Sequence, residues 1–210
     1  NRLYMVNGFR KIQIKFETKM KIICHRINSY KELKNINVEH GVEVDVRYHE
    51  NEVVLNHDPF HGSNAEKFSL FLSEYKLKGT LIINLKTEGI ENECLKLLVR
   101  NKIKSWFFLD MSQPYLVKYS NSSEIHKDNL AVRFSDYEPV EYALSFKDKV
   151  GWVWLDRFKT NCLTEESYSK LKEANFNICI VSPELQGESL DTVKQYKLYI
   201  SNFDVDAVCT

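Results

Sequence analysis

The sequence is short of the features that mark membrane, multidomain or strongly charged proteins. No apolar run approaches the roughly 20 residues of a transmembrane helix, so no membrane span is expected. Proline and glycine are scarce, and no stretch rich in Pro, Gly or Ser separates two domains, so 210 residues predict one domain. Basic and acidic residues both number 29, and this zero net charge disfavours a nucleic-acid or anionic-membrane surface. A local basic pocket is still compatible with zero net charge.

Cysteine is used in a way that disfavours a disulfide framework. The five cysteines are odd in number, scattered, and contain no C-x-x-C pair. Cys24, Cys179 and Cys209 lie in strand-like runs, so we expect buried reduced thiols rather than disulfides or a zinc site. This usage favours a cytoplasmic location.

The first 19 residues differ from the rest. They carry five Lys or Arg and no continuous apolar segment, so they do not resemble a signal peptide. Met20 directly precedes the first convincing strand, and we expect a true start close to it. We therefore predict an N-terminal appendage over 1–19 and the functional domain over 20–210. Alternating apolar residues at 12–16 are compatible with an extra strand in the appendage.

Strand-like and helix-like segments alternate from residue 21 to the end. The expected strands are 21–26, 41–47, 80–86, 104–110, 130–135, 151–156, 177–182 and 205–209. The expected helices are 66–75, 89–102, 113–119, 140–146, 164–174 and 189–200. The stretch 48–58 reads as an extra strand or an extended loop.

This alternation predicts an α/β protein, a short single-domain (β/α)8 TIM barrel whose final helix is absent. A doubly wound open sheet is the competing architecture. It usually has fewer strands and a glycine-rich first turn, whereas the first turn here, His25–Asn28, has no glycine.

One strand carries two carboxylates on a single face. Glu43, Asp45 and Arg47 alternate with valines, and residues i and i+2 of a strand point the same way. Carboxylates about 7 Å apart repel unless a cation lies between them. A hard cation such as Mg2+ or Ca2+ suits oxygen ligands, and a buried salt-bridge network with Arg47 or Lys86 is the alternative.

Two histidines flank this strand. His25 closes the apolar run before Arg26, and His57 precedes Asp58, which is placed to hold the imidazole. One histidine at a strand end is usually structural, but two beside paired carboxylates indicate an acid/base pair. The remaining histidines lie in polar, loop-like surroundings and are expected at the surface: His40, His49, His61 and His126.

Further polar residues end the later strands, where barrel active sites are built. Asn84 and Lys86 share a face and are candidates for metal and phosphate binding, respectively. Four others are candidate site residues, although most such residues serve as caps or loop ties: Asp110, Arg133, Asp156 and Glu184.

Taken in order, these residues resemble the glycerophosphodiester phosphodiesterase family, part of the phosphatidylinositol-specific phospholipase C-like barrel superfamily. The matching pieces are His25-Arg26, Glu43-x-Asp45, His57-Asp58 and Asn84-x-Lys86. The resemblance implies that His25 and His57 are the acid/base pair, that Glu43 and Asp45 bind a divalent cation, and that Arg26 and Lys86 hold phosphate. The expected metal ligands are therefore Glu43, Asp45 and, from the residue argument above, Asn84.

Three departures from the family pattern concern the site. Ile27 stands where the family has glycine, Asn84 stands where it has a carboxylate, and the chain between His25 and Glu43 has room for one short helix. The loss of charge at Asn84 is expected to weaken metal binding unless Asp110 or another carboxylate substitutes. The family's last strand also continues beyond the point where this chain ends.

We therefore expect a metal-dependent hydrolase of a small glycerophosphodiester-like substrate, with Mg2+ or Ca2+ as cofactor. Two alternatives keep the same barrel: a phosphate-ester-binding module without turnover, and a lyase that forms a cyclic phosphate. A glycosidase fits poorly, because its two acids usually come from different strands. The flanking alcohols and the oligomeric state are not specified by the sequence.

Overall fold

The computed structural model describes residues 20–59 and 65–210, and the expectations for residues 1–19 and for His61 lie outside this range. Eight strands in the described part pair in parallel. They are β1 (Lys21–Cys24), β2 (Gly41–His49), β5 (Leu81–Leu85), β6 (Trp106–Leu109), β7 (Ala131–Phe134), β8 (Trp152–Leu155), β9 (Asn177–Val181) and β10 (Ala207–Cys209). Each of them falls at one of the eight predicted strands.

The strands close into a barrel. Neighbours follow chain order from β1 through β2, β5 and β6, and again from β7 to β10, which pairs in parallel with β1. Between β6 and β7 the structure has one parallel bridge, Phe108 to Leu130, so this seam is the least tightly bonded. The fold is thus the predicted (β/α)8 barrel and not an open sheet.

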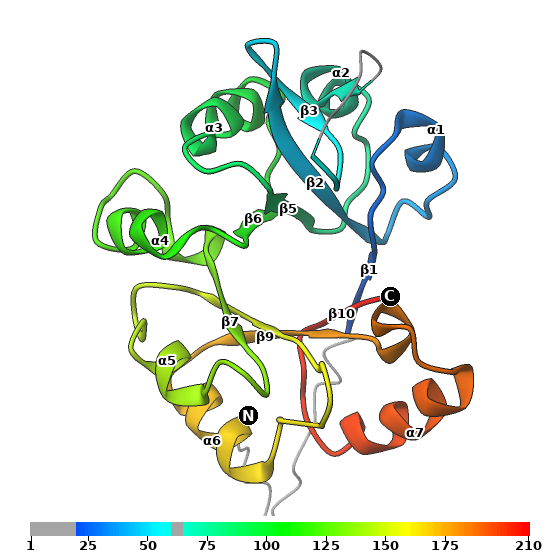
Figure 1. The fold of residues 1–210 in the computed structure, drawn as a ribbon, viewed down its shortest axis with the longest axis vertical. Helices are drawn as coiled ribbons and strands as arrows, with labels where there is room; N and C mark the ends of the chain where they lie inside the picture. The colour runs from blue at the N-terminus through cyan, green and yellow to red at the C-terminus, as the bar shows by residue number, and fades with distance from the viewer. Residues whose placement is uncertain (1–19, 60–64) are drawn as a thin grey trace, which may run out of the picture.

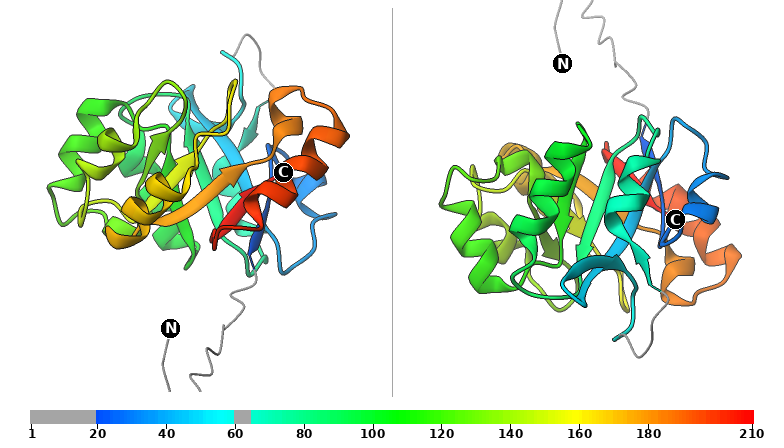
Figure 2. Two further views of the ribbon diagram at one scale, coloured as in Figure 1. Left: turned by 90° about the horizontal axis from the view of Figure 1, so that it is seen from below. Right: turned by 90° about the horizontal axis from the view of Figure 1, so that it is seen from above.

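In residues 20–59 and 65–210, seven α-helices follow the first seven barrel strands and lie outside them (Figures 1 and 2). They are α1 (Tyr30–Leu33), α2 (Phe68–Ser73), α3 (Glu91–Arg100), α4 (Gln113–Ser120), α5 (Val140–Leu144), α6 (Glu165–Glu173) and α7 (Leu190–Ile200). The chain ends at Thr210, directly after β10. Among the described residues no helix has the length and apolarity needed to span a membrane.

An antiparallel excursion interrupts the alternation after β2. Strand β3 (Glu52–Leu55) pairs with the end of β2, and the short β4 (Glu66–Lys67) pairs with β3. The tight turn places Glu50 and Asn51 in the left-handed region, which suits a hairpin. This excursion accounts for 48–58, and it makes the helix predicted over 66–75 begin only at Phe68.

The alternation of side chains divides the core into two layers. Val42, Val44 and Val46 pack in the layer between strands and helices, as the sequence predicts. Ile23, Ile82 and their neighbours fill the inside of the barrel. The opposite, polar face of β2 therefore opens into the barrel mouth.

All five cysteines are free thiols.

Candidate active site

The candidate site lies where β1, β2 and β5 end. Glu43 and Asp45 project from β2, and Asn84 on β5 stands in register with Asp45. The three residues are 1%, 0% and 8% exposed, respectively, so their polar groups depend on partners inside the protein. The three predicted metal ligands therefore form one buried cluster.

Glu43 is held by two hydrogen bonds. The backbone N–H of Arg26 donates to its Oε2 at 2.9 Å, and Asn84 Nδ2 donates to its Oε1, also at 2.9 Å. These bonds favour the charged carboxylate, but burial and the nearby charge of Asp45 outweigh them and raise the pKa of Glu43 to about 7. Without a cation, the cluster therefore resists carrying two negative charges.

Asp45 is bonded reciprocally to Asn28, a residue that the sequence analysis did not single out. Asn28 Nδ2 donates to Asp45 Oδ2 at 2.9 Å, and the Asp45 N–H donates back to Asn28 Oδ1 at 2.8 Å. Asn28 lies in the loop after β1, directly before Ser29, which caps α1. A single polar residue in a loop gives no sequence signal for such a pairing.

The oxygens of this cluster fit a hard divalent cation. Asp45 Oδ1 and Asn84 Oδ1 are buried and accept no hydrogen bond from any described residue. Two carboxylates and an amide are the oxygen donors that Mg2+ and Ca2+ prefer. Among the described residues, no group of three or more His, Cys, Asp or Glu side chains is placed to hold a metal.

His25 and Arg26 form the turn after β1. Arg26 has a left-handed backbone with φ of 52°, which aims its N–H at Glu43. His25 Nε2 lies 3.8 Å from Glu43 Oε2, and the His25 N–H is fixed by the carbonyl of Thr210. Burial and the adjacent Arg26 charge lower the pKa of His25, which favours the neutral imidazole.

His57 reaches the site from the segment after β3. Arg26 Nη2 lies 2.7 Å from His57 Nε2, and Asp58 Oδ1 lies 2.8 Å from His57 Nδ1. Because a guanidinium only donates, the neutral ring must accept at Nε2 and carry its proton on Nδ1. Asp58 thus orients His57, as the sequence suggested.

Lys86 connects two acids at the mouth. Its Nζ lies 3.6 Å from Asp45 Oδ1 and 3.4 Å from Asp110 Oδ2. The alternative interpretation, a buried salt-bridge network, is thus confirmed for Lys86 and Asp45. Arg26 adds a second cation, with its Nε 3.9 Å from Asp45 Oδ2. Two cationic side chains, Arg26 and Lys86, therefore face the acid cluster.

The remaining candidates lie on the later strands. Arg133 bonds Asp110 on one side and Asp156 on the other, so these three join Lys86 in one network. Glu184 lies apart from this network. Burial opposes its ionisation, but hydrogen bonds from Ser182 and Thr210 prevail and lower the pKa of Glu184. Asp110 already pairs with two cations, Lys86 and Arg133.

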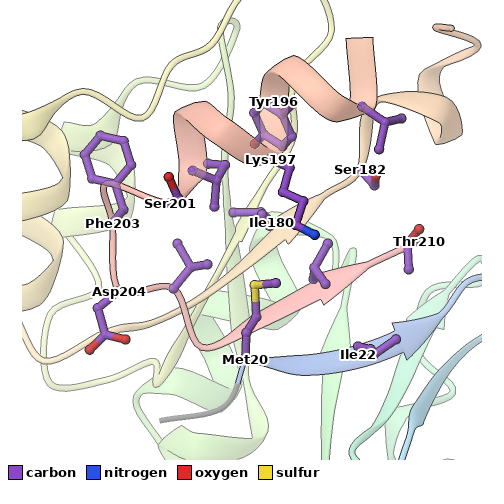
Figure 3. Close-up of a pocket in the computed structure, with 14 residues that line it drawn as sticks. Met20, Ile22, Ile180, Ser182, Tyr196, Lys197, Ser201, Phe203, Asp204 and Thr210 are labelled. Carbon is purple, nitrogen blue, oxygen red and sulfur yellow. The ribbon is translucent and has the colours of Figure 1, made fainter. Parts of the chain in front are cut away.

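A separate cavity of about 520 Å³ lies outside the barrel, between α7 and the strands β1 and β10 (Figure 3). Ile22, Ile180 and Val208 form its floor, and Tyr196 and Ile200 of α7 cover it. None of the predicted site residues lines it. The polar chemistry therefore gathers at the mouth and not in this apolar cavity.

The closed α/β barrel is a class of architecture that solved structures share. A glycerophosphodiester phosphodiesterase from Agrobacterium tumefaciens str. C58 matches with a TM-score of 0.63 and 13% identity, covering 90% of this chain and 96% of that one. A putative glycerophosphodiester phosphodiesterase from Galdieria sulphuraria matches with a TM-score of 0.67 and 15% identity, covering 91% and 93%. At these identities the likeness is one of fold. Neither a protein-family model nor a curated protein matches the sequence.

Proposed function

We propose that this chain is a metal-dependent phosphodiester hydrolase of the glycerophosphodiester phosphodiesterase family. The observation that carries the proposal is the cluster of Glu43, Asp45 and Asn84, with two unbonded buried oxygens beside two histidines. The shared barrel of the two structures named above supports it. The substrate class is a diester of phosphate with glycerol or another alcohol.

The residues divide into four tasks. Arg26 and Lys86 bind the phosphate oxygens, and Glu43, Asp45 and Asn84 hold the cation. When bound, a divalent cation supplies Lewis-acid stabilisation of charge on the phosphate oxygens. His25, kept neutral by its surroundings, takes the proton from the attacking water. When Arg26 turns from His57 Nε2 to the substrate phosphate, that nitrogen is free to carry a proton. His57 then delivers this proton to the departing alcohol and regains one from solvent.

Hydrolysis assays with and without cations test this proposal. Bis-p-nitrophenyl phosphate and a panel of glycerophosphodiesters are incubated with EDTA, Mg2+, Ca2+ or Mn2+. We expect cation-dependent turnover that falls about 100-fold or more in His25→Ala, because general acid–base groups contribute about 10²–10⁴-fold. His126→Ala, at an exposed histidine outside the site, is the matched control and should keep full activity.

Three results would point elsewhere. Folded protein without turnover on any diester would contradict the hydrolase and favour the binding module. Activity in EDTA would remove the cation from the proposal. A cyclic phosphate product, identified by phosphorus NMR, would instead assign a lyase in which a neighbouring hydroxyl of the substrate attacks.

A further inference from the structure

Arg47 makes contacts that its position beside the acids does not predict. It follows Asp45 on the polar face of β2, yet its guanidinium donates to backbone carbonyls. Nε and Nη2 reach the carbonyl of His57 at 3.1 and 2.7 Å, and Nη1 reaches the carbonyl of Lys86 at 3.0 Å. One side chain thus bonds the main chain of two proposed site residues.

The two bonded segments differ in how firmly the barrel holds them. Lys86 continues β5, and its N–H donates to the carbonyl of Val46 at 2.9 Å within the parallel ladder. His57 lies beyond β3, outside the barrel strands, and the nearest ladder-type bond joins the Asn56 N–H to the Asp45 carbonyl. Arg47 therefore matters more for the backbone of His57 than for that of Lys86.

The chemistry of arginine suits this role. Its planar guanidinium presents donors in a fixed fork, so the two carbonyls are held in one plane at a set separation. A lysine has one compact ammonium and cannot reproduce both sides of the fork. The imidazole of His57 is fixed separately, by Arg26 and Asp58. Removing Arg47 should therefore loosen the backbone of His57, while the imidazole keeps its contacts with Arg26 and Asp58.

We infer that Arg47 is a positioning residue that locks His57 onto the barrel. This inference rests on the proposed function, because it assigns Arg47 a part in proton transfer by His57. It binds neither substrate nor cation. Its loss should slow the chemical step and leave substrate and cation binding in place.

The test compares Arg47→Met and Arg47→Lys with Arg100→Met, a matched change at an exposed arginine of α3. With bis-p-nitrophenyl phosphate, we expect kcat of Arg47→Met to fall about 10- to 100-fold, because small misplacement of a catalytic group has effects of this size. KM should stay within about twofold, and Arg47→Lys should recover part of the loss because it can keep one bond. Arg100→Met should match wild type.

A double-mutant cycle separates positioning from a general structural role. If Arg47 acts through His57, Arg47→Met should cost little in a His57→Ala background, because the group it positions is gone. An equal fold-loss in both backgrounds would overturn the inference. A rise in KM without a fall in kcat would also overturn it.

Hydrogen exchange provides a readout that does not need activity. In Arg47→Met and Arg47→Lys we expect the amides of residues 55–58 to exchange faster, while those of β5 stay protected by the barrel ladder. Unchanged exchange over 55–58 would overturn the inference. If wild-type protein turns over no diester, the proposed function fails, yet exchange still reports whether Arg47 holds this segment.

Discussion

Asp45 has no exposed surface, and its position depends on polar partners from separate parts of the chain. Asn28 from the first loop bonds both its side chain and its backbone, and Lys86, directly after β5, faces its other oxygen. A buried polar group that loses its partner costs about 1–3 kcal/mol. The stability of the site is therefore sensitive to Asn28, a residue with no assigned chemistry.

We predict that Asn28→Ala lowers the free energy of unfolding by about 1–3 kcal/mol, because it leaves Asp45 Oδ2 and the Asp45 N–H without their partner. Urea unfolding followed by circular dichroism measures the change. Asn35→Ala is the control, since Asn35 is exposed and its side chain donates to the nearby Lys31 carbonyl. Equal stabilities of the two variants would show that the Asn28 pairing contributes nothing.

Glu43 gives a prediction whose sign depends on pH. Its pKa rises from 4.5 to about 7 on folding, so its folded form is favoured when protonated. This contribution is fully present below pH 4.5 and is lost as pH rises toward 7. In EDTA at pH 8, Glu43→Gln should therefore be more stable than wild type by up to about 3 kcal/mol. At pH 4 the two proteins should be alike.

The same variant tests the cation site. Asn84 can flip its amide so that its Oδ1 accepts from the new amide nitrogen, and its Nδ2 then gives up the bond to residue 43. Adding Mg2+ or Ca2+ should stabilise wild type more than Glu43→Gln, because the variant lacks one anionic oxygen. Urea unfolding at pH 4 and 8, with EDTA or cation, measures both effects. Equal stabilisation by the cation would place its site elsewhere.

At the scale of elements, the sequence predicted what local periodicity determines. Each barrel strand shows as an apolar run, and β2 shows its two faces as valines alternating with Glu43 and Asp45. Asn84 and Lys86 alternate in the same way at the end of β5. A candidate site at the ends of the first strands could thus be predicted from the sequence, because the candidate residues are close in sequence and share strand faces.

The long-range contacts of the candidate site could be found only from the folded structure. Asn28 is 17 residues from Asp45, and Arg47 is 39 residues from the Lys86 carbonyl it bonds. Periodicity says nothing about which loop carbonyl a long side chain will reach. The short helix α2 has the same origin, because pairing of β4 with β3 takes the residues that an isolated helix would use. Tertiary pairing here overrides local preference.

At the scale of the whole molecule, the barrel is continuous except at one seam. Strands β1, β2 and β5 support the acid cluster through regular parallel ladders, whereas β6 and β7 share one bridge. Asn129 reinforces this seam, because its Nδ2 donates to the Trp106 carbonyl at 2.7 Å. The acid cluster is thus built on strands joined by continuous ladders and not on the two strands at the seam.

We predict that Asn129→Ala opens the seam and leaves the site intact. Loss of this bond should lower the free energy of unfolding by about 1–2 kcal/mol and speed amide exchange in β6 and β7. Exchange in β1, β2 and β5 should not change, because their ladders do not depend on Asn129. Hydrogen-exchange mass spectrometry makes the comparison, with Asn202→Ala as control, since exposed Asn202 bonds only the nearby Tyr199 carbonyl. If exchange accelerates equally around the barrel, the strands open as one cooperative unit and the seam is no weaker than the rest.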